Sequence, residues 1–357
     1  MSDQLADSAE RLFASQVSKT VLRAADGGDW PAALWAAVEE TGYTAALLPE
    51  ESGGFGASAA EAFGLVRVAA AHAAPIPLAE TMLAGWLLAR AGLPVPAGVL
   101  TVAPVRRDTR ALSGDTLALS GTNGSWRLAG TAARVPWGRR ADAIAVLAEG
   151  PDGPMVACVP AGAFAVGHGR NVADEPRDAV TVDGPVTAGR SPVSPAQLRA
   201  AGAALRTAQM AGALSRILAL CVAYVQTRVQ FGRPIGKFQA IQQAMAVLAG
   251  QAAAAGAAAD LAADAFAAGL DPFVVGAAKA RAGEAASIAA GIAHQVHGAI
   301  GFTQEYELHP LTRRLWAWRE EFGNEAEWNA LVGRRALEAG ADGLWPKITE
   351  SMMTDAA

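Results

Sequence analysis

Cysteine, lysine and charged side chains are all scarce in this 357-residue sequence. Its two cysteines, Cys158 and Cys221, lie far apart in apolar surroundings, which excludes a disulfide framework and predicts buried thiols in a reducing compartment, the cytoplasm. Charged residues make up 18% of the chain and the net charge is -5, so no basic surface is available to a nucleic acid. We therefore expect no nucleic-acid partner.

Long uninterrupted apolar runs are also absent. Charged residues such as Arg90 and Asp260 break the longest ones, so no segment of about 20 apolar residues could cross a bilayer. The first ten residues carry three acidic side chains and no apolar run, which argues against a signal peptide. We expect a protein that is not inserted in a membrane.

Apolar surface is plentiful instead, because AVILMFWYC residues make up 52% of the chain. Global disorder is excluded, and the length predicts two or three packed units. Apolar residues recur at helical spacing as far as residue 93, short apolar or alternating runs follow, and long helical periodicity returns after a Pro- and Gly-rich connector at 184–195. The sequence therefore predicts a multi-domain α+β protein.

The domain boundaries follow these changes of texture: 1–97 for a helical N-terminal domain, 98–190 for a β domain and 195–350 for a helical bundle. The alanine-rich residues 250–268 would let helices approach closely. Packing inside the bundle and an interface with another subunit explain them about equally well. The expected strands contain residues 117–119, 126–128, 144–147, 155–159 and 180–182, and the expected C-terminal helices span 198–225, 235–268, 272–295 and 311–318.

Residues 228–239, RVQFGRPIGKFQ, predict the end of one helix, a glycine turn and a second helix that starts after a proline. An arginine in the position of Arg228 can bind an anionic group through bidentate hydrogen bonds. It can also simply offset the helix dipole, which is the commoner role when the motif is taken alone.

Residues 295–302, QVHGAIGF, combine two glycines, which let a ligand approach the backbone, with the polar side chains of Gln295 and His297. An ordinary helix stop is the alternative. His294 and His297 have helical spacing for a metal, but no further ligands accompany them, so we expect no metal site.

Residues 48–56, LPEESGGFG, form a third unusual segment, a glycine-rich turn after a helix. Its glycines partly match a dinucleotide-binding fingerprint, but no strand precedes them and no βαβ unit surrounds them. A Rossmann site is therefore excluded.

Together and in this order, the three segments resemble the flavin-dependent acyl-CoA dehydrogenase family. They match its P-E-x-x-G-G-x-G turn at 49–56, its R-x-x-F-G-x-P-I-x-x-F-Q segment at 228–239 and its Q-x-x-G-x-x-G-F segment at 295–302. The resemblance covers nearly the whole chain. It implies a helical N-terminal domain, a central β-barrel and a C-terminal four-helix bundle.

The resemblance also implies FAD, whose ADP part lies across a subunit interface. The implied activity is α,β-desaturation of an acyl-CoA: a carboxylate removes the α proton, a β hydride passes to the flavin, and the electrons leave to an electron-transfer flavoprotein. The residues that match the family's ADP contacts are Arg228, Phe231 and Gln239 on one subunit and Gln295, His297 and Gly298 on another.

The catalytic carboxylate is where the sequence departs from the family. The family's Y-E-G-T falls on residues 321–324, EFGN, so Phe322 takes the position of the base, and residues 199–205, where other members carry it, contain no acid. Removal of a thioester α proton needs a carboxylate within about 3 Å. Glu321, with Glu320 behind it, is the best substitute, and a solvated cluster of Arg319, Glu320 and Glu321 is the alternative.

The stretches that hold the flavin ring in the family are altered too. T-E-P-x-x-G-S-D appears as APVRRD at 103–108 and W-I-[ST]-x-G as RVPWG at 134–138, where proline replaces the hydroxyl residue. We therefore expect the ADP contacts to be kept and the ring seat in this subunit's own β domain to be weakened.

Three functions follow from these features. Short bacterial members of the family that act on bulky steroid side-chain CoA thioesters are α2β2 assemblies in which one subunit has lost the base, and this chain resembles that subunit. It would contribute FAD contacts to a hetero-oligomer with a second acyl-CoA dehydrogenase subunit. The alternatives are a self-sufficient homo-oligomeric dehydrogenase with Glu321 as its base, and a structural partner subunit that binds no cofactor.

Overall fold

The computed structural model describes residues 2–103, 117–122, 124–151 and 153–350. Its chain divides into two compact units. The helical unit comprises Met1–Arg23, Phe63–Ala74 and Gly202–Ala357, and the sheet unit comprises Ala24–Ala62 and Pro75–Ala201. Helices of the N-terminal third therefore contribute to two different cores.

The N-terminal third is helical, as its apolar spacing predicts. In the helical unit, Phe13 is fully buried and its ring stacks on His72, whose Nε2 lies 2.9 Å from Glu10 Oε1. In the sheet unit, one helix is buried along most of its length around Leu83 and Leu87. The helices are α1 (Ser2–Gln16), α2 (Lys19–Asp26), α3 (Ala32–Glu40), α4 (Ala59–Ala71) and α5 (Leu78–Arg90), with short 3-10 turns η1 (Tyr43–Ala45) and η2 (Glu50–Ser52).

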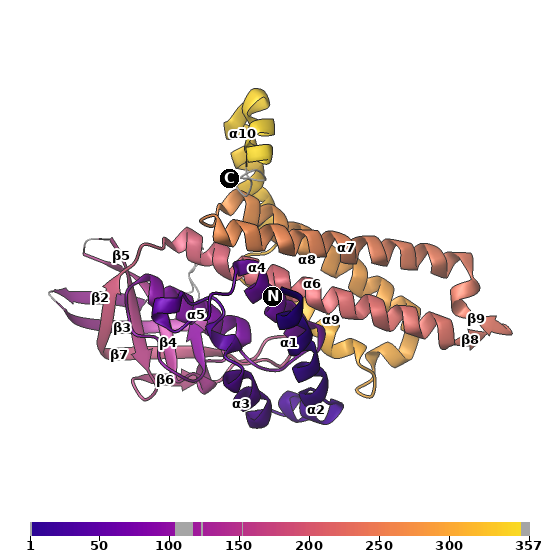
Figure 1. Cartoon of the computed structure of the whole chain (residues 1–357), viewed down its shortest axis with the longest axis horizontal. Coiled ribbons are helices and arrows are strands. Elements are labelled where there is room, and N and C mark those ends of the chain that lie inside the picture. The colour runs from indigo at the N-terminus through magenta and orange to yellow at the C-terminus, as the bar shows by residue number, and fades with distance from the viewer. Residues whose placement is uncertain (1, 104–116, 123, 152, 351–357) are drawn as a thin grey trace. The chain divides into compact units, whose positions relative to one another are not determined.

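The sheet unit is built on one seven-stranded sheet (Figure 1). Its order is β1-β4-β5-β7-β3-β2, with β6 paired to β7. Apolar residues at alternate positions, such as Ile144 with Val146 and Val180 with Val182, form its core. The strands are β1 (Leu100–Val102), β2 (Leu117–Thr122), β3 (Ser125–Pro136), β4 (Ala143–Gly150), β5 (Gly153–Pro160), β6 (Phe164–Gly167) and β7 (Arg177–Arg190).

The expectation of a β-barrel needs correction. Within the described residues the strand order has two ends, β1 and β2, so no hydrogen-bonded ring closes. The physical reason lies at one end, where β1 has only three residues and all three pair in parallel with β4. As far as its residues are described, the central domain is therefore an open sheet.

The prediction of a connector at 184–195 is wrong for its first half, because strand β7 continues to Arg190. Gly184 pairs with Leu128 and Pro185 with Arg127, so backbone pairing overrides the turn-forming composition. Only residues 191–194 separate β7 from the next helix.

The C-terminal part is helical, as predicted, although the described residues contain five α-helices where four were expected. Asp271 caps one of them, because its Oδ1 accepts a hydrogen bond from Phe273 N at 2.9 Å with Pro272 in the first turn. The helices are α6 (Pro195–Thr227), α7 (Gln239–Ala267), α8 (Pro272–His297), α9 (Leu308–Glu320) and α10 (Glu325–Glu350).

The alanine-rich part of α7 serves the protein's own core in one half of the helix. Ala255, Ala259 and Ala262 are buried where α7 runs along α8 (Figure 1). In the other half, Val247 and Gly250 are exposed. Packing inside the protein thus accounts for the C-terminal half of α7. The N-terminal half of α7 has an exposed apolar face.

Two helices, α6 and α7, are long and apolar enough to span a membrane by length and composition, against the expectation from the sequence. Half of the apolar window of α6 is buried, and 22% of that of α7. Core helices of proteins in solution pass the same test, so this finding alone assigns no membrane segment.

Both cysteines are free thiols, which confirms that no disulfide joins them. Cys221 is buried as predicted, whereas Cys158 is only half-buried, so the prediction of two buried thiols is wrong for Cys158. Burial raises the pKa of the Cys221 thiol to about 12, so this side chain is protonated and unreactive at neutral pH.

Candidate functional site

The first candidate segment forms a hairpin beyond the end of α6. Arg228 N donates to Tyr224 O at 2.9 Å, and Ile235 N donates back to Arg228 O at 2.9 Å. Between them lie the two-residue strands β8 (Val229–Gln230) and β9 (Arg233–Pro234) and a short 3-10 turn, η4 (Ile235–Lys237). At the tip, Phe231 and Gly232 have φ values of 52° and 80°, and the Phe231 side chain is 91% exposed.

The side chains of this hairpin are available to a ligand. The Arg228 guanidinium is exposed and makes no hydrogen bond or ion pair within the described residues, and Gln239 is exposed at the first position of α7. Arg233 is already engaged, because its guanidinium carbon lies 4.3 Å from the centroid of the Phe238 ring. An unpaired guanidinium and an exposed aromatic ring in one hairpin fit an anionic ligand that carries a flat ring system, such as a nucleotide.

The second candidate segment begins where α8 ends. Gly298 has φ 64° and ψ -143°, and a 3-10 turn, η5 (Gly298–Phe302), follows it. Gln295 and Gly298 are exposed. A Cβ at Gly301 would lie 3.1 Å from both His297 Cβ and a methyl group of Leu308, so close packing explains this glycine.

His297 points inward, away from Gln295 and Gly298. It is 4% exposed; its Nδ1 lies 2.8 Å from Ala293 O and its Nε2 lies 3.0 Å from the Tyr306 hydroxyl. Burial lowers the pKa of His297, so the ring is neutral at pH 7. Both ring nitrogens are engaged within the helical unit, and the side chain supports the turn from inside.

The two segments lie at the same end of the helical bundle. The ring of Tyr224, one turn before Arg228, is 4.4 Å from the ring of His297, and its hydroxyl donates to His297 O at 3.3 Å. This end of α6 is marked in Figure 1 by β8 and β9. Residues that are 76 positions apart, as Cys221 and His297 are, thus meet here.

The two family positions for the base are side by side in the helical unit. Phe322, in the turn between α9 and α10, has φ 56° and packs its ring on Gly202 of α6. A Cβ on Gly202 would lie 2.2 Å from Phe322 Cδ1, so only glycine leaves room for the ring. The turn and the stretch of α6 that the resemblance assigns to the base are thus in contact, through the Phe322 ring and Gly202.

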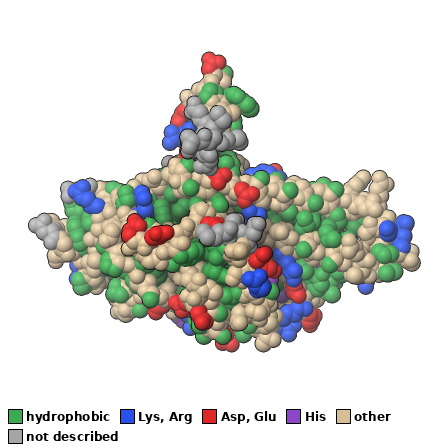
Figure 2. All heavy atoms as spheres, in the orientation of Figure 1, with side chains coloured by type: hydrophobic (Ala, Val, Ile, Leu, Met, Phe, Trp, Pro, Cys, Tyr) green, Lys and Arg blue, Asp and Glu red, His purple; other side chains and the backbone are tan. Residues whose placement is uncertain are grey.

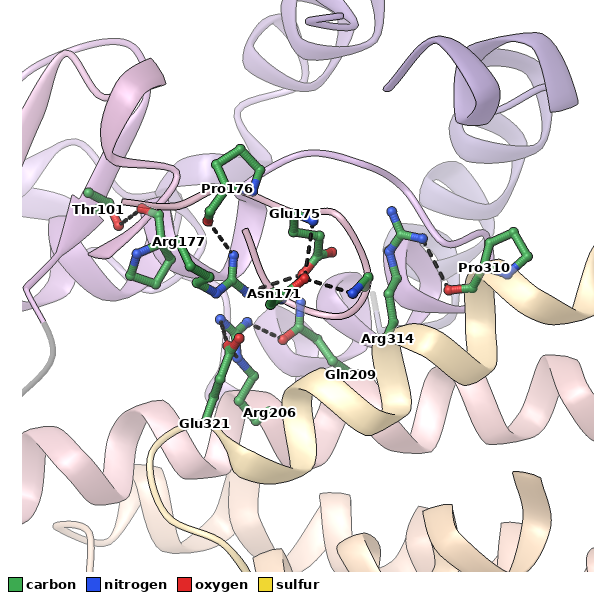
Figure 3. Close-up of polar contacts among 12 residues, drawn as sticks. Thr101, Asn171, Glu175, Pro176, Arg177, Arg206, Gln209, Pro310, Arg314 and Glu321 are labelled. Atoms are coloured by element: carbon green, nitrogen blue, oxygen red, sulfur yellow. Dashed lines mark hydrogen bonds and ion pairs between the residues drawn. The ribbon is translucent and has the colours of Figure 1, made fainter. Parts of the chain in front are cut away.

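Glu321, the predicted substitute base, is bound in an ion pair. Its Oε2 lies 2.8 Å from Arg206 Nε and 2.7 Å from Arg206 Nη2, and Arg206 also donates to Gln209 Oε1 (Figure 3). The Arg206 side chain is 2% exposed and the Glu321 side chain 18%. Glu320 is exposed, so the alternative of a solvated cluster holds for Glu320 and not for Glu321.

The candidate base region and the candidate cofactor segment occupy opposite ends of α6. Arg206 and Arg228 are 22 positions apart in the helical register, which corresponds to about 33 Å along the axis. This separation exceeds the reach of one flavin nucleotide. The two candidate regions are therefore well separated along α6.

In the sheet unit, the RVPWG stretch forms part of the core. Trp137 has φ 54° and packs edge-on against Trp30 at 6.1 Å, and Pro136 O accepts a hydrogen bond from Thr101 Oγ1 at 2.6 Å. Of the other altered stretch, residues 104–108 lie outside the described residues. In the glycine-rich turn at 48–56, a Cβ on Gly54 would lie 1.8 Å from Leu48 O, so tight backbone packing requires this glycine.

A polar loop in the sheet unit was not predicted from the sequence. Asn171 Oδ1 accepts hydrogen bonds from Ala173 N and Glu175 N, and Arg177 forms a buried ion pair with Glu175 at 3.1 Å (Figure 3). The signal in the sequence was the cluster of Asn, Asp and Pro in residues 171–176. Among the described residues no group of three or more His, Cys, Asp or Glu could hold a metal ion.

Replacing Gly202 by alanine is expected to lower the free energy of unfolding by roughly 1–3 kcal/mol, because the added methyl group displaces the Phe322 ring. Combining it with Phe322→Ala should recover part of the loss, which a double-mutant cycle measured by urea unfolding would detect as a coupling of about 1 kcal/mol or more. Gly291→Ala is the matched control, since nothing lies within 4 Å of its Cβ. Additive effects of the two substitutions would contradict the packing of Phe322 on Gly202.

Models of two domains of one protein family match the chain. "Acyl-CoA dehydrogenase, N-terminal domain" matches residues 2–94, and "Acyl-CoA dehydrogenase, C-terminal domain" matches residues 200–337. Acyl-CoA dehydrogenase FadE27 of Mycobacterium tuberculosis is 33% identical over 228 residues, which cover 60% of this chain and 61% of that protein.

Two further matches from Mycobacterium tuberculosis cover most of both chains. Acyl-CoA dehydrogenase IpdE2 is 29% identical over 315 residues, 87% of this chain and 89% of that protein. A chain in the crystal structure of the ChsE4-ChsE5 complex superposes with a TM-score of 0.82 at 25% identity, covering 94% of this chain and 97% of that one.

Proposed function

Since this chain belongs to the acyl-CoA dehydrogenase family, a family of flavin-dependent oxidoreductases that act on CH–CH bonds, we propose that it is the base-deficient subunit of a hetero-oligomeric acyl-CoA dehydrogenase. The observation that carries the proposal is the ring of Phe322 on Gly202, which closes both family positions of the base. The partner is a second acyl-CoA dehydrogenase subunit that supplies the carboxylate.

Glu321 is a poor replacement for the missing base. A base must be free to take the α proton, but Glu321 Oε2 already accepts a hydrogen bond from Nε of buried Arg206 and forms an ion pair with its Nη2. Protonation of Glu321 would break this ion pair and leave the Arg206 charge buried without its counterion. A homo-oligomeric enzyme that depends on Glu321 is therefore the less favoured function.

The cofactor in this proposal is FAD, with its ADP part at the end of α6 and α8. Arg228, Phe231 and Gln239 on one subunit, and Gln295 and Gly298 on another, would contact it, while His297 holds the turn from inside. When bound, FAD would supply the acceptor for the β hydride, and an electron-transfer flavoprotein would take the electrons onward. The unpaired guanidinium of Arg228 and the bare ring of Phe231 support this placement.

An assembly of more than one subunit is supported by two features of the helical unit. Arg206 and Arg228 are separated by about 33 Å along α6, which supports assigning the base position and the cofactor segment to different active sites. The exposed half of α7 presents Val247 and small residues to solvent, and Figure 2 shows hydrophobic side chains scattered over α6 and α7 on this face. A partner subunit would cover them.

We propose a bulky acyl-CoA of the steroid side-chain type as substrate, following the short bacterial members that the sequence resembles, and the cytoplasm as location, following the two free thiols. The test measures dehydrogenation of CoA thioesters from butyryl-CoA to a steroid side-chain thioester, with an artificial electron acceptor. We expect turnover from the chain co-purified with its partner and none from the chain alone.

Glu321→Gln separates the two enzymatic functions. In the complex it should leave kcat/KM within about twofold, because the base comes from the partner. Turnover by the chain alone that Glu321→Gln abolishes would establish the self-sufficient enzyme instead.

A further inference from the structure

The turn that carries Phe322 is held by side chains from three other elements. Arg206 of α6 forms an ion pair with Glu321. Trp328 of α10 donates a hydrogen bond from Nε1 to Phe322 O at 3.1 Å. At Gly323 the anchor is Lys279 of α8, whose Nζ donates to Gly323 O at 2.9 Å. Each residue of the turn thus has its own polar anchor from outside.

Lys279 makes two hydrogen bonds to this region of the chain. It is 1% exposed, and its Nζ also donates to Arg319 O at 2.7 Å, the end of α9, so one side chain joins the helix end to the turn. The turn needs such support because Phe322 and Gly323 have φ values of 56° and 102°, and a positive φ is unfavourable for a phenylalanine.

We propose that Lys279 is a positioning residue whose two hydrogen bonds hold the turn at residues 321–323, and that it thereby keeps the Phe322 ring on Gly202 in the place of the base. The inference rests on the proposed function only where it calls the position of Phe322 that of the catalytic base. The contacts themselves are independent of any cofactor or partner, and so is the test below.

Charged side chains on α6, α9, α10 and the turn between α9 and α10 surround Lys279. Arg206 lies on α6, Arg319 and Glu320 on α9, Glu321 in the turn and Glu325 at the start of α10, where its Oε2 lies 2.8 Å from Arg319 Nη2. With Lys279 protonated, three cations face three carboxylates. Deprotonation leaves one excess negative charge, but the amine keeps two N–H groups for the two carbonyls.

The pKa of Lys279 is lowered to about 7, chiefly by its complete burial. A lysine with a lowered pKa in the folded state binds fewer protons than the unfolded chain between pH 7 and about 10, so stability rises with pH in this window. The unfolding equilibrium constant should fall by up to about tenfold per pH unit on this account. The same group adds no stability below pH 7.

The experiment compares wild type, Lys279→Met and the matched control Lys19→Met, whose side chain is 59% exposed, by hydrogen exchange of the full chain read by mass spectrometry. Lys279→Met should speed exchange in peptides covering residues 319–324 at least tenfold, and Lys19→Met should leave it unchanged. Urea unfolding between pH 7 and 9 gives the second readout: wild type should gain stability relative to Lys279→Met. The pH difference reports the burial of the amine, and the exchange of residues 319–324 reports its hold on the turn.

If Lys279→Met fails to fold, Trp328→Phe tests whether polar anchors hold the turn, because it removes the hydrogen bond to Phe322 O along with part of the buried ring. Faster exchange confined to residues 319–324 supports the inference. Unchanged exchange of this turn in the variant that folds, or a pH dependence identical to that of wild type in Lys279→Met, would overturn it. Flavin content plays no part in either readout, so failure here is distinct from failure of the proposed function.

Discussion

Glu321→Ala is expected to lower the free energy of unfolding by about 3–5 kcal/mol, because it leaves the buried Arg206 guanidinium without its carboxylate. Urea or thermal unfolding of the purified chain measures the change. Glu320→Ala is the matched control: its carboxylate is exposed, so the loss should stay within about 0.5 kcal/mol.

The loss of stability in Glu321→Ala distinguishes a carboxylate that pairs with a buried cation from one that is free to act as a base. A general base that waits for substrate is not tied to a buried cation, so its removal would cost little stability and much activity. Near-wild-type stability in Glu321→Ala, together with loss of turnover in the folded protein, would contradict the role we assign to the ion pair.

Arg228→Ala is expected to weaken FAD binding by the complex roughly 10- to 100-fold, because charge-assisted hydrogen bonds to an anion contribute about 1.5–3 kcal/mol. Flavin absorbance of the purified complex and titration of the apoprotein with FAD measure the loss. Arg216→Ala is the control on the same helix, since its half-exposed guanidinium is already paired with Glu307 at 2.8 Å.

The same variant tests the third function. If the complex retains its full flavin content after Arg228→Ala, the arginine only caps the end of α6 and offsets its dipole. The chain would then be a structural partner without cofactor contacts, provided that Gln295→Ala gives the same result.

Helices and strands with a buried apolar face were predictable from the sequence, and elements without one were not. The helix α10 was not predicted, because Leu337 and Trp345 are exposed, Gly340 has φ 68° and Pro346 lies inside the helix. The C-terminal part of β7 was not predicted, because its glycine and proline residues pair with β3 through the backbone. Side-chain patterns do not reveal such pairing. The open sheet in place of a barrel depends on strand pairing and not on composition.

The site shows the same division. Motif spacing identified the segments around Arg228 and Gln295, and the structure places them at one end of the bundle, but the assignment of His297 to cofactor contact did not foresee its inward position beside Tyr306. Arg206 and Lys279 are charged residues in apolar helical runs, which is the one signal that indicates buried, paired charges. Their partners around residue 321 lie 40 to 115 positions away in sequence, so only the folded chain identifies them.

The central claim is that this subunit contributes cofactor contacts to an active site whose base belongs to a partner. The most direct measurement is the ratio of FAD to protein, by absorbance, for the chain purified alone and co-expressed with its partner, combined with turnover of both samples. We predict little flavin and no turnover for the lone chain, and both for the complex. One FAD per chain with full turnover in the lone protein would contradict the account.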